Sequence, residues 1–455
     1  MATHSETITP PTRSIPPTTL GTRGSILAAA VVLGATAYLL EGVIGPHQQA
    51  AVGAVCFILI VAASSMNLHA VRWRTVGWGL ALQLALALVI LKFQVGGVRP
   101  GYALLSAIAN VVKKFLEFTN AGSQFVFGGL ADPAAMAKVF PGGLVFAFTA
   151  LPTIIFVSSF FTVLYYFGIL QLIVRLMASS MMYLMRTSGA ETLSAAANVF
   201  MGQTEAPIIV KPYVPGMTQS ELLALMVGGM ATISGGVMAV YISMGADPVA
   251  ILTTSVMAAP CGLYLSKLML PELEEPATRG DATIAVERSH VNVIDAAAAG
   301  ASDGMMLAIN VAAMLIAFLA FIALFDYVLG RISPGLSLSR VFSWVFAPVA
   351  FLMGVPRQDV PAVADLLGTK LVANEFVAFV KLTSQYRGVI SERAYVLSTF
   401  ALTGFANFAS IGIQLGGIGG MAPARRPDLA RLGMRALLVG FLATMINASI
   451  AGMLL

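Results

Sequence analysis

Apolar stretches of roughly membrane-spanning length follow one another along most of this chain. They fall near 25–40, 50–65, 76–95, 143–170, 221–245, 249–270, 304–330, 341–355, 395–420 and 436–455. A helix needs about 20 apolar residues to cross the hydrocarbon layer of a bilayer. The pattern therefore predicts an all-α polytopic membrane protein with about nine transmembrane helices. Several stretches are short or interrupted by Gly and Pro, which indicates broken and re-entrant helices in addition.

The composition agrees with a membrane protein. Hydrophobic residues make up 58% of the 455 residues and charged residues 10%, against about 25% charged residues in ordinary soluble domains. The net charge is +5, but the basic residues fall in short segments between apolar stretches, so we expect membrane lipids around the protein and no nucleic acid partner. Cys56 and Cys261 lie in separate apolar stretches without metal-ligand spacing, so a disulfide framework or a zinc site has no support.

The amino terminus is polar before the first apolar stretch. Residues 1–24 are rich in Thr, Ser and Pro, which predicts a disordered tail. The stretch after it follows basic residues, as the core of a signal peptide does, but no small-x-small cleavage site comes next. We therefore expect 25–44 to be an additional N-terminal transmembrane helix.

Basic loops indicate the orientation. Arg72 and Arg74 follow the second apolar stretch, and four Arg lie between 425 and 435. The positive-inside rule places these loops and the tail in the cytoplasm, and the C-terminus on the periplasmic or extracellular side of the inner (plasma) membrane. The amphipathic segment 101–120 fits an interfacial helix or a core helix.

Two segments carry polar residues where the chain is otherwise apolar. "NVFMGQTEAP" precedes the Gly-interrupted helix around "MATISGGV", and "GTKLVANEFVAF" precedes the one around "GFANFASIGI". Each half of the chain thus offers a re-entrant hairpin followed by a broken helix. This order predicts an internal repeat of inverted topology whose broken helices meet near the bilayer midplane.

The glutamates in these segments predict a binding site. A carboxylate at membrane depth costs ~2.5–3.5 kcal/mol or more, so Glu205 and Glu375 need a water-filled cavity, a partner or a ligand. Pro207 and Pro212 interrupt helical hydrogen bonding, as at a hairpin tip. The alternative is that both segments are ordinary aqueous loops with solvated carboxylates.

The same segments resemble a known family. "SAAANVFMGQTEAPIIVKPYVPGMTQSEL", "GGMATISGGVMAVYISMGA", "NVIDAAAAGASDG", "GTKLVANEFVAF" and "GFANFASIGIQLGGIGG" are similar to the hallmark segments of the concentrative nucleoside transporter family, from about residue 50 to the carboxyl end. The resemblance implies a secondary active transporter (symporter) of nucleosides of the uridine, cytidine and adenosine class. It also implies a homotrimer in which each protomer moves a transport region against a scaffold by an elevator mechanism.

The resemblance implies a nucleoside site. The residues expected on the nucleobase side are Gln203, Thr204, Glu205 and Val237, and those expected on the ribose side are Glu375, Asn407 and Ser410, with Phe405 packed nearby. An amide, a hydroxyl and a carboxylate match a base edge, and a carboxylate is a strong acceptor for sugar hydroxyls. The preference between purines and pyrimidines stays open.

The coupling ion implied by the resemblance is sodium (Na+), with a proton (H+) as the alternative. The expected ligands are side-chain oxygens of Asn198 and Thr232 and backbone carbonyls of Met201 and Ile233. Hard cations prefer such oxygens. Many bacterial relatives have serine where Thr232 stands, which keeps a hydroxyl. No organic cofactor is expected.

The pattern and the resemblance together divide the chain. We expect a tail (1–24), an additional span (25–44), scaffold spans with an interfacial helix (45–190), the first hairpin and broken helix (191–270), a polar loop (271–290), further core and scaffold helices (291–355), and the second hairpin, second broken helix and last span (356–455).

Other functions have weaker support. An intramembrane enzyme would use Glu205 and Glu375 as an acid/base pair, but no nucleophile or metal cluster accompanies them. A channel would give uptake without concentration. No GxxxxGK[ST] is present, so ATP-driven transport has no support. Lys211 is expected to be a loop residue rather than a direct ligand, and Asp303 in "GASDG" a helix cap rather than a residue that organises a broken helix.

Overall fold

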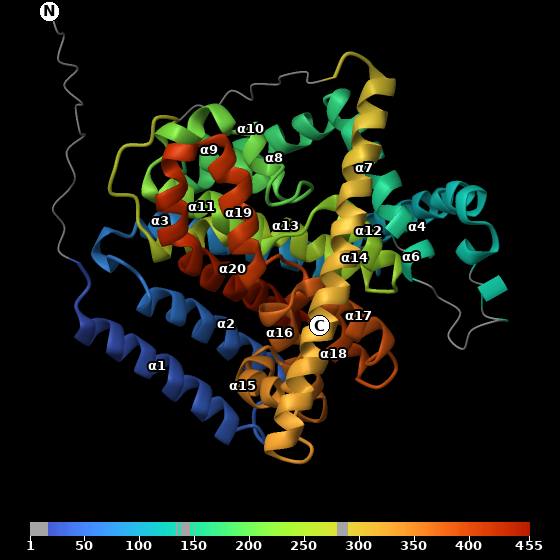
Figure 1. Cartoon of the computed structure of the whole chain (residues 1–455). Coiled ribbons are helices and arrows are strands. Elements are labelled where there is room, and N and C mark those ends of the chain that lie inside the picture. The colour runs from blue at the N-terminus through green and yellow to red at the C-terminus, as the bar shows by residue number, and fades with distance from the viewer. Residues whose placement is uncertain (1–16, 133–134, 137, 139–145, 150, 280–289) are drawn as a thin grey trace, which may run out of the picture.

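The computed structural model describes residues 17–132, 135–136, 138, 146–149, 151–279 and 290–455, and these form a bundle of helices (Figure 1). The α-helices, in chain order, are α1 (Leu20–Leu39), α2 (Pro46–Ala63), α3 (Trp73–Ala87), α4 (Pro100–Phe127), α6 (Phe146–Thr149), α7 (Leu151–Tyr166), α8 (Ile169–Met185), α9 (Gly189–Ala197), α10 (Ala206–Ile209), α11 (Gln219–Ala231), α12 (Gly235–Ser243), α13 (Pro248–Met269), α14 (Val293–Ile332), α15 (Leu338–Leu352), α16 (Val360–Val372), α17 (Glu375–Ser384), α18 (Glu392–Leu402), α19 (Phe408–Met421) and α20 (Arg426–Leu454). Short 3-10 or π-helical turns are η1 (Leu68–Ala70), η2 (Leu88–Lys92), η3 (Gly128–Ala131), η4 (Lys211–Gly216), η5 (Arg357–Asp359) and η6 (Pro423–Arg425).

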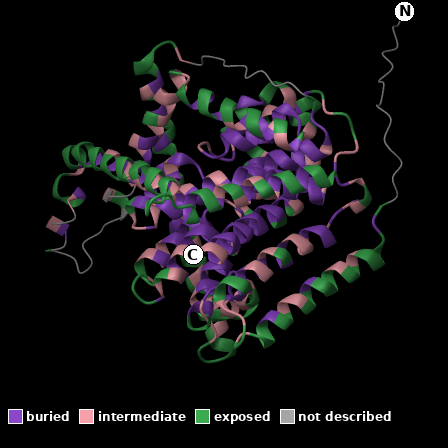
Figure 2. Cartoon of the chain, turned by 180° about the vertical axis from the view of Figure 1, so that it is seen from behind, coloured by how far each residue is buried: buried purple, intermediate pink, exposed green. Residues whose placement is uncertain are grey.

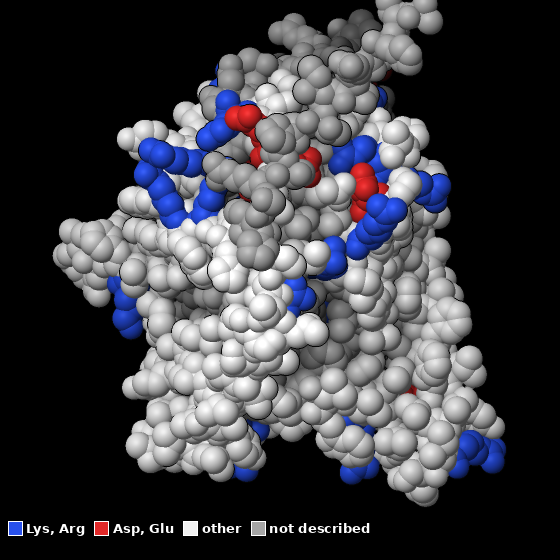
Figure 3. Space-filling view, turned by 90° about the vertical axis from the view of Figure 1, so that its left-hand side faces the viewer, with Lys and Arg blue, Asp and Glu red and all other residues white. Residues whose placement is uncertain are grey.

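The fold is that of a multi-pass membrane protein, as the apolar stretches predict. Within the described residues, 7 helical segments are long and apolar enough to cross a membrane. The bent pair α7 and α8, whose axes differ by 72°, would make an eighth. On the face shown in Figure 3, Lys and Arg gather toward the two ends and leave a nearly uncharged band between them. Such a band is what a bilayer interior requires.

The N-terminal helix starts earlier than the sequence predicts. α1 begins at Leu20, within the segment expected to be a tail, because the Thr19 side chain accepts a hydrogen bond from the Thr22 backbone N–H (3.2 Å) and so caps the helix. The Arg23 guanidinium then donates to the Met66 carbonyl (3.3 Å). The tail itself, residues 1–16, lies outside the described residues.

α4 is a peripheral helix. Its buried residues, Ala109, Leu116, Thr119 and Ser123, are spaced three to seven apart along one face, and most of the rest of the helix is exposed (Figure 2). This burial along one face agrees with the interfacial helix expected for segment 101–120, which stays a prediction.

Three helices form the buried centre of the bundle. In the membrane-spanning segments that contain α11, α13 and α20, 83–94% of the most apolar 18-residue stretch is buried. Figure 2 shows this centre surrounded by exposed peripheral helices. Close approach of α20 to α11 needs a small residue, since a Cβ on Gly440 would lie 2.6 Å from the Cβ of Met230. A larger side chain there would separate the two helices.

Each half of the chain contains a hairpin followed by an interrupted helix. We name the hairpins H1 (α9, a turn over 198–205, and α10) and H2 (α16, a turn over 373–374, and α17), and the interruptions B1 (232–234, between α11 and α12) and B2 (403–407, between α18 and α19). B1 and B2 meet directly, because the Phe405 N–H donates to the Thr232 carbonyl (3.1 Å). The two predicted hairpins and broken helices are therefore present.

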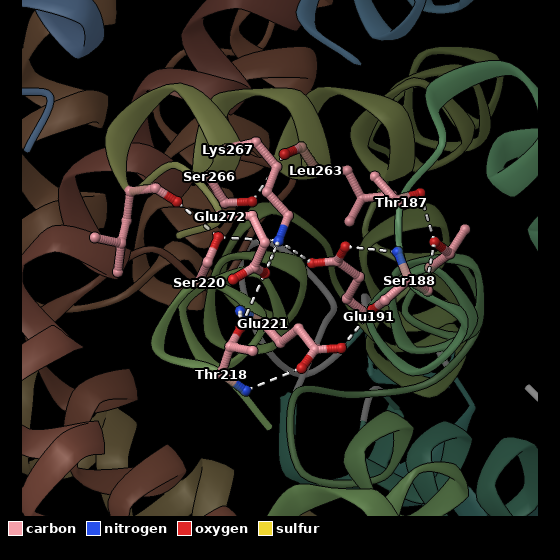
Figure 4. A network of polar contacts seen from close by, with 12 residues as sticks. Thr187, Ser188, Glu191, Thr218, Ser220, Glu221, Leu263, Ser266, Lys267 and Glu272 are labelled. Atoms are coloured by element: carbon pink, nitrogen blue, oxygen red, sulfur yellow. Dashed lines mark hydrogen bonds and ion pairs between the residues drawn. The ribbon is translucent and has the colours of Figure 1, made fainter. Parts of the chain in front are cut away.

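A buried ion cluster holds the base of H1 (Figure 4). The Lys267 ammonium on α13 lies 2.6 Å from a Glu191 oxygen of α9 and 3.1 Å from a Glu272 oxygen. Glu272 also accepts from the Thr218 hydroxyl at the start of α11 (2.9 Å). The cluster thus joins α9, α11, α13 and the first residues of the polar loop.

The loop after α13 is bonded to the start of H1. The Thr278 carbonyl accepts from the Gly189 N–H (2.9 Å), and the Thr278 hydroxyl oxygen accepts from the Ala190 N–H (3.1 Å). Such N–H groups lack helical partners in the first turn of a helix, so Thr278 satisfies two of them beside the N-cap residue Ser188. Residues 280–289, the remainder of the expected polar loop, lie outside the described residues.

We expect Lys267→Met to destabilise the fold strongly. Removing one partner of a buried ion pair costs about 3–5 kcal/mol, because the remaining carboxylates stay buried without compensation. Arg279→Met is the matched control: its pair with Glu275 is 63% and 72% exposed, and exposed pairs contribute about 0–1 kcal/mol. Thermal unfolding of the two purified variants checks this; equal midpoints would contradict it.

Candidate functional site

Glu375 lies in a polar cluster where H2 meets both interrupted helices. The residue is 5% exposed. One oxygen accepts from the Tyr241 hydroxyl (3.1 Å), and the other accepts from the Asn407 amide (2.9 Å). A carboxylate has about four acceptor positions, so two donors leave it able to accept further hydrogen bonds.

A chain of hydrogen bonds continues from Glu375 to H1. The Asn407 side-chain oxygen accepts from the Ser410 N–H (2.9 Å), and the Ser410 hydroxyl oxygen accepts from the Gln203 amide (3.2 Å). Gln203 is 7% exposed. Its side-chain oxygen has no hydrogen-bond partner among the described residues, although buried polar atoms are normally paired. The arrangement leaves a buried acceptor for a ligand.

Three helix N-termini lie in the same region. Ser234 caps α12, Asn374 caps α17, and Asn407 caps α19, each with its side-chain oxygen. These residue types favour such positions because they satisfy the free N–H groups of a first turn. Each N-terminus carries a partial positive charge, which stabilises a carboxylate such as Glu375 and attracts electron-rich ligand groups.

Thr204 and Glu205 lie at the H1 turn beside a cavity. A Cβ on Gly417 of α19 would lie 2.7 Å from the Thr204 methyl group, so α19 approaches H1 where only glycine fits. A Glu205 oxygen accepts from the Gly202 N–H (3.0 Å). The cavity of about 500 Å³ is lined by Ser158, Phe161, Thr162, Tyr165, Leu170, Phe200, Met201, Glu205, Ile208, Lys211, Pro212, Ser234, Gly235, Gly236, Asp303, Leu307 and Met421.

The predicted nucleobase and ribose residues therefore fall into two groups. Glu205 is exposed at the wall of the cavity, whereas Gln203, Glu375, Asn407 and Ser410 are buried and linked by hydrogen bonds. Of the remaining residues, Val237 is buried in the first turn of α12, and Phe405 is half-buried in B2.

The helix-cap prediction for Asp303 is wrong. α14 continues from Val293 to Ile332 without interruption, and Asp303 lies inside it, exposed at the cavity wall. The apolar residues on both sides continue the helix through a single carboxylate, which has room in the cavity.

A second buried acceptor lies where H1 meets B1. The Asn198 amide donates to the Ser194 carbonyl (3.0 Å), and the Asn198 side-chain oxygen has no partner within the part of the chain that the structure describes. The Thr232 hydroxyl donates to the Gly228 carbonyl (2.8 Å), which leaves its oxygen free to accept. A Cβ on Gly228 would lie 2.9 Å from the Asn198 amide nitrogen, so both side chains are close to that glycine.

Backbone contacts also bring the H1 turn and B1 together. The Phe200 carbonyl accepts from the Gly235 N–H (2.8 Å), which fixes the H1 turn against B1. Met201 directly follows Phe200, and Ile233 lies two residues before Gly235. The carbonyls of these two residues are the ones expected to bind sodium. α9 and α11 both end here, and the carbonyl ends of helices favour cations. The donor set of amide, hydroxyl and carbonyl oxygens suits a small hard cation.

Sequence reasoning missed two polar residues of the site. Tyr241 lies one turn after Val237 on α12, is fully buried, and stacks on Phe379 of H2 with ring centroids 4.0 Å apart. Gln414 lies one turn after Ser410 and donates to the Met226 carbonyl (3.0 Å). Both could have been found from the sequence, because Tyr241 lies one helical turn from Val237 and Gln414 one turn from Ser410, on the same helix faces.

Comparisons with known proteins identify the family. The model described as "Na+ dependent nucleoside transporter N-terminus" matches residues 52–130, "Nucleoside recognition" matches 147–248, and "Na+ dependent nucleoside transporter C-terminus" matches 250–452. The sodium/nucleoside cotransporter 1 of Mus musculus is 42% identical over 451 residues, which cover 94% of this chain and 67% of the mouse protein. An uncharacterized transporter of Haemophilus influenzae is 43% identical, over 88% of this chain and 96% of its own length.

A solved structure has the same fold. CNTnw in an inward-facing, substrate-bound state is 39% identical and superposes with a TM-score of 0.84, over 90% of this chain and 97% of the other.

Proposed function

Since this chain belongs to the sodium-dependent nucleoside transporter family, we propose that it is a symporter that imports nucleosides across the inner membrane and is driven by a sodium gradient. The family consists of transporters, and the chain is not an enzyme. The observation that carries the proposal is the hydrogen-bonded chain from Tyr241 through Glu375, Asn407 and Ser410 to Gln203, which unites both repeats around unsatisfied acceptors.

The polar chain has the chemistry of a nucleoside site. Glu375 has acceptor capacity for ribose hydroxyls, and Gln203 offers an unpaired carbonyl oxygen to a base edge. We assign Thr204, Glu205, Val237 and Phe405 to the surroundings of the base and ribose, with uridine, cytidine and adenosine as the substrate class. A small number of placed polar groups in an otherwise apolar pocket is typical of small-molecule sites.

The proposed ion site adjoins this chain at H1. Asn198 and Thr232 contribute side-chain oxygens, and Met201 and Ile233 contribute carbonyls. Its support is the unpartnered Asn198 oxygen at the carbonyl ends of α9 and α11. Because H1 carries both this site and Gln203, sodium binding orders the residue that meets the base, which is the physical basis of coupling.

We assign the movement to an elevator mechanism in a homotrimer. Residues 191–270 and 356–455 hold the transport region, with H2, B1, B2 and all of H1 except the first two residues of α9, whereas 45–190 and 291–355 form most of the scaffold. Helix α1 (Leu20–Leu39) covers most of the additional span expected over 25–44 and packs against α2. In the orientation that we propose, the amino terminus is cytoplasmic and the chain crosses the membrane about nine times.

The decisive experiment is uptake into proteoliposomes. A panel of nucleosides is crossed with imposed sodium and proton gradients, each applied alone. We expect concentrative uptake with an inward sodium gradient and none with potassium in its place. Uptake that ignores sodium and rises with an inward proton gradient would replace sodium by a proton, and uptake that never exceeds equilibrium would indicate a channel.

We expect Gln203→Met to change base preference without a ribose defect. The substitution removes the amide that bonds to Ser410 and the unpaired oxygen that faces the base. Affinity should therefore shift by about 1–3 kcal/mol for some bases and little for others. Competition by uridine, cytidine, adenosine and guanosine against labelled uridine measures this. A uniform loss across all four, with protein abundance unchanged, would contradict the assignment.

A further inference from the structure

H2, the hairpin that carries Glu375, also carries a buried lysine. Lys370 on α16 is completely buried (0% exposed), five residues before Glu375. Its ammonium donates to the Ala401 carbonyl (2.6 Å) and to the Thr444 hydroxyl oxygen (2.8 Å). The nitrogen also lies 5.6 Å from the centre of the Phe441 ring.

All three of these partners are neutral. Within the described chain, no carboxylate oxygen lies within 4.0 Å of the Lys370 nitrogen. The other lysines in buried clusters differ, since Lys267 has Glu191 at 2.6 Å and Lys381 has Asp365 at 2.5 Å. A buried charge without a close counter-ion is costly. An apolar side chain would fill the same space at lower cost, so packing does not explain the charge.

The ammonium lies at the carbonyl end of a half-helix. Ala401 is in the last turn of α18, immediately before B2. Carbonyls there lack helical partners and carry partial negative charge, which a cation stabilises. The Thr444 hydroxyl donates to the Phe441 carbonyl (2.9 Å), so its oxygen is oriented to accept from Lys370. The neutral partners together coordinate the ammonium as they would a small cation.

The other repeat has a matching position. Thr232 follows α11 as Thr403 follows α18, and each hydroxyl donates to the carbonyl four residues earlier (2.8 and 2.7 Å). The end of α11 is where we place sodium. The end of α18 is where the Lys370 ammonium lies. Each repeat thus has a position for a positive charge at the carbonyl end of its first half-helix.

We propose that Lys370 is a positioning residue for nucleoside binding, a tethered cation that takes in the second repeat the place that sodium takes in the first. The inference rests on the proposed function, because its effect passes through Glu375. Lys370 and Glu375 belong to the same hairpin, and the bonds of Lys370 to Ala401 and Thr444 hold α16 against α18 and α20. Lys370 thereby fixes H2 in the position that aims the Glu375 carboxylate at the ribose hydroxyls.

The test compares two ligands that differ only in the ribose hydroxyls. Affinities of the purified full chain for uridine and for 2′,3′-dideoxyuridine are measured in sodium. Lys370→Met keeps the length of the side chain and removes its charge. We expect uridine affinity to fall about tenfold, the loss of one charge-assisted hydrogen bond, whereas dideoxyuridine, which lacks the hydroxyls that Glu375 accepts, changes little.

A matched control separates positioning from general damage. Leu367→Ala removes a completely buried side chain one turn earlier on α16 and leaves a cavity that destabilises the helix. It should weaken both ligands by the same factor. If Lys370→Met does not fold, Thr444→Val replaces it, since this change keeps the shape of the side chain, removes the hydroxyl that accepts from Lys370, and should weaken uridine selectively.

Equal weakening of both ligands by the variant, or unchanged uridine affinity, would overturn the role of Lys370. A wild-type protein that binds neither ligand would instead refute the proposed function, so the two failures are distinguishable.

Discussion

Glu375→Gln is expected to reduce nucleoside uptake by about tenfold to a hundredfold, equivalent to ~1.5–3 kcal/mol for the loss of hydrogen bonds to a charged acceptor. The structure adds a second reason. Tyr241 and Asn407 each donate to a different oxygen of Glu375, and glutamine has only one oxygen. One of these buried donors therefore loses its acceptor, at a further cost of about 1–3 kcal/mol.

Initial uptake rates in proteoliposomes, at matched protein density, measure this effect. Glu274→Gln is the control, because it removes an equal charge from an exposed position. In the unmodified protein, uracil should compete poorly with uridine, since the base alone offers no hydroxyl to Glu375. Equal inhibition by uracil and uridine, or full activity of the Glu375 variant, would show that this carboxylate does not bind ribose.

Asn198→Ala or Thr232→Ala is expected to remove most of the sodium dependence of nucleoside binding. Coupling between two ligands amounts to about 1–3 kcal/mol, or roughly 5–150-fold in affinity. Asn198 carries the unpartnered buried oxygen, and Thr232 the hydroxyl at the end of α11. Uridine affinity is measured as sodium replaces potassium at constant ionic strength, and linkage requires uridine to raise sodium affinity by the same factor.

Two controls accompany this measurement. Thr232→Ser keeps the hydroxyl and should keep most of the dependence. Thr403→Ala removes the corresponding hydroxyl at B2, where the same bond to the preceding turn is made, and should leave the sodium dependence intact. If Thr403→Ala flattened the dependence as much as Thr232→Ala, the ion site would not be at B1.

Much of the fold follows from local features of the sequence. The length of the apolar stretches predicts spans because a bilayer has a fixed thickness. The Gly and Pro interruptions predict broken helices and a hairpin tip after Glu205, because these residues change backbone hydrogen bonding within one turn. The family is also identified correctly, since its motifs are contiguous. The individual site residues follow from the family resemblance, whereas the local signals indicate only the polar segments that carry them.

Only the tertiary structure determines which distant segments of the chain are in contact. Tyr241 meets Glu375 across 134 positions of the chain, and Gln203 meets Ser410 across 207; no periodicity within one helix specifies such pairs. Asp303 shows the same limit, because its exposure at a cavity depends on how α14 packs against other elements. Lys370 was hidden for a related reason. Its sequence neighbours indicate an ordinary hairpin helix. The oxygen atoms that coordinate its ammonium come from α18 and α20, and they surround it only when these helices pack against α16.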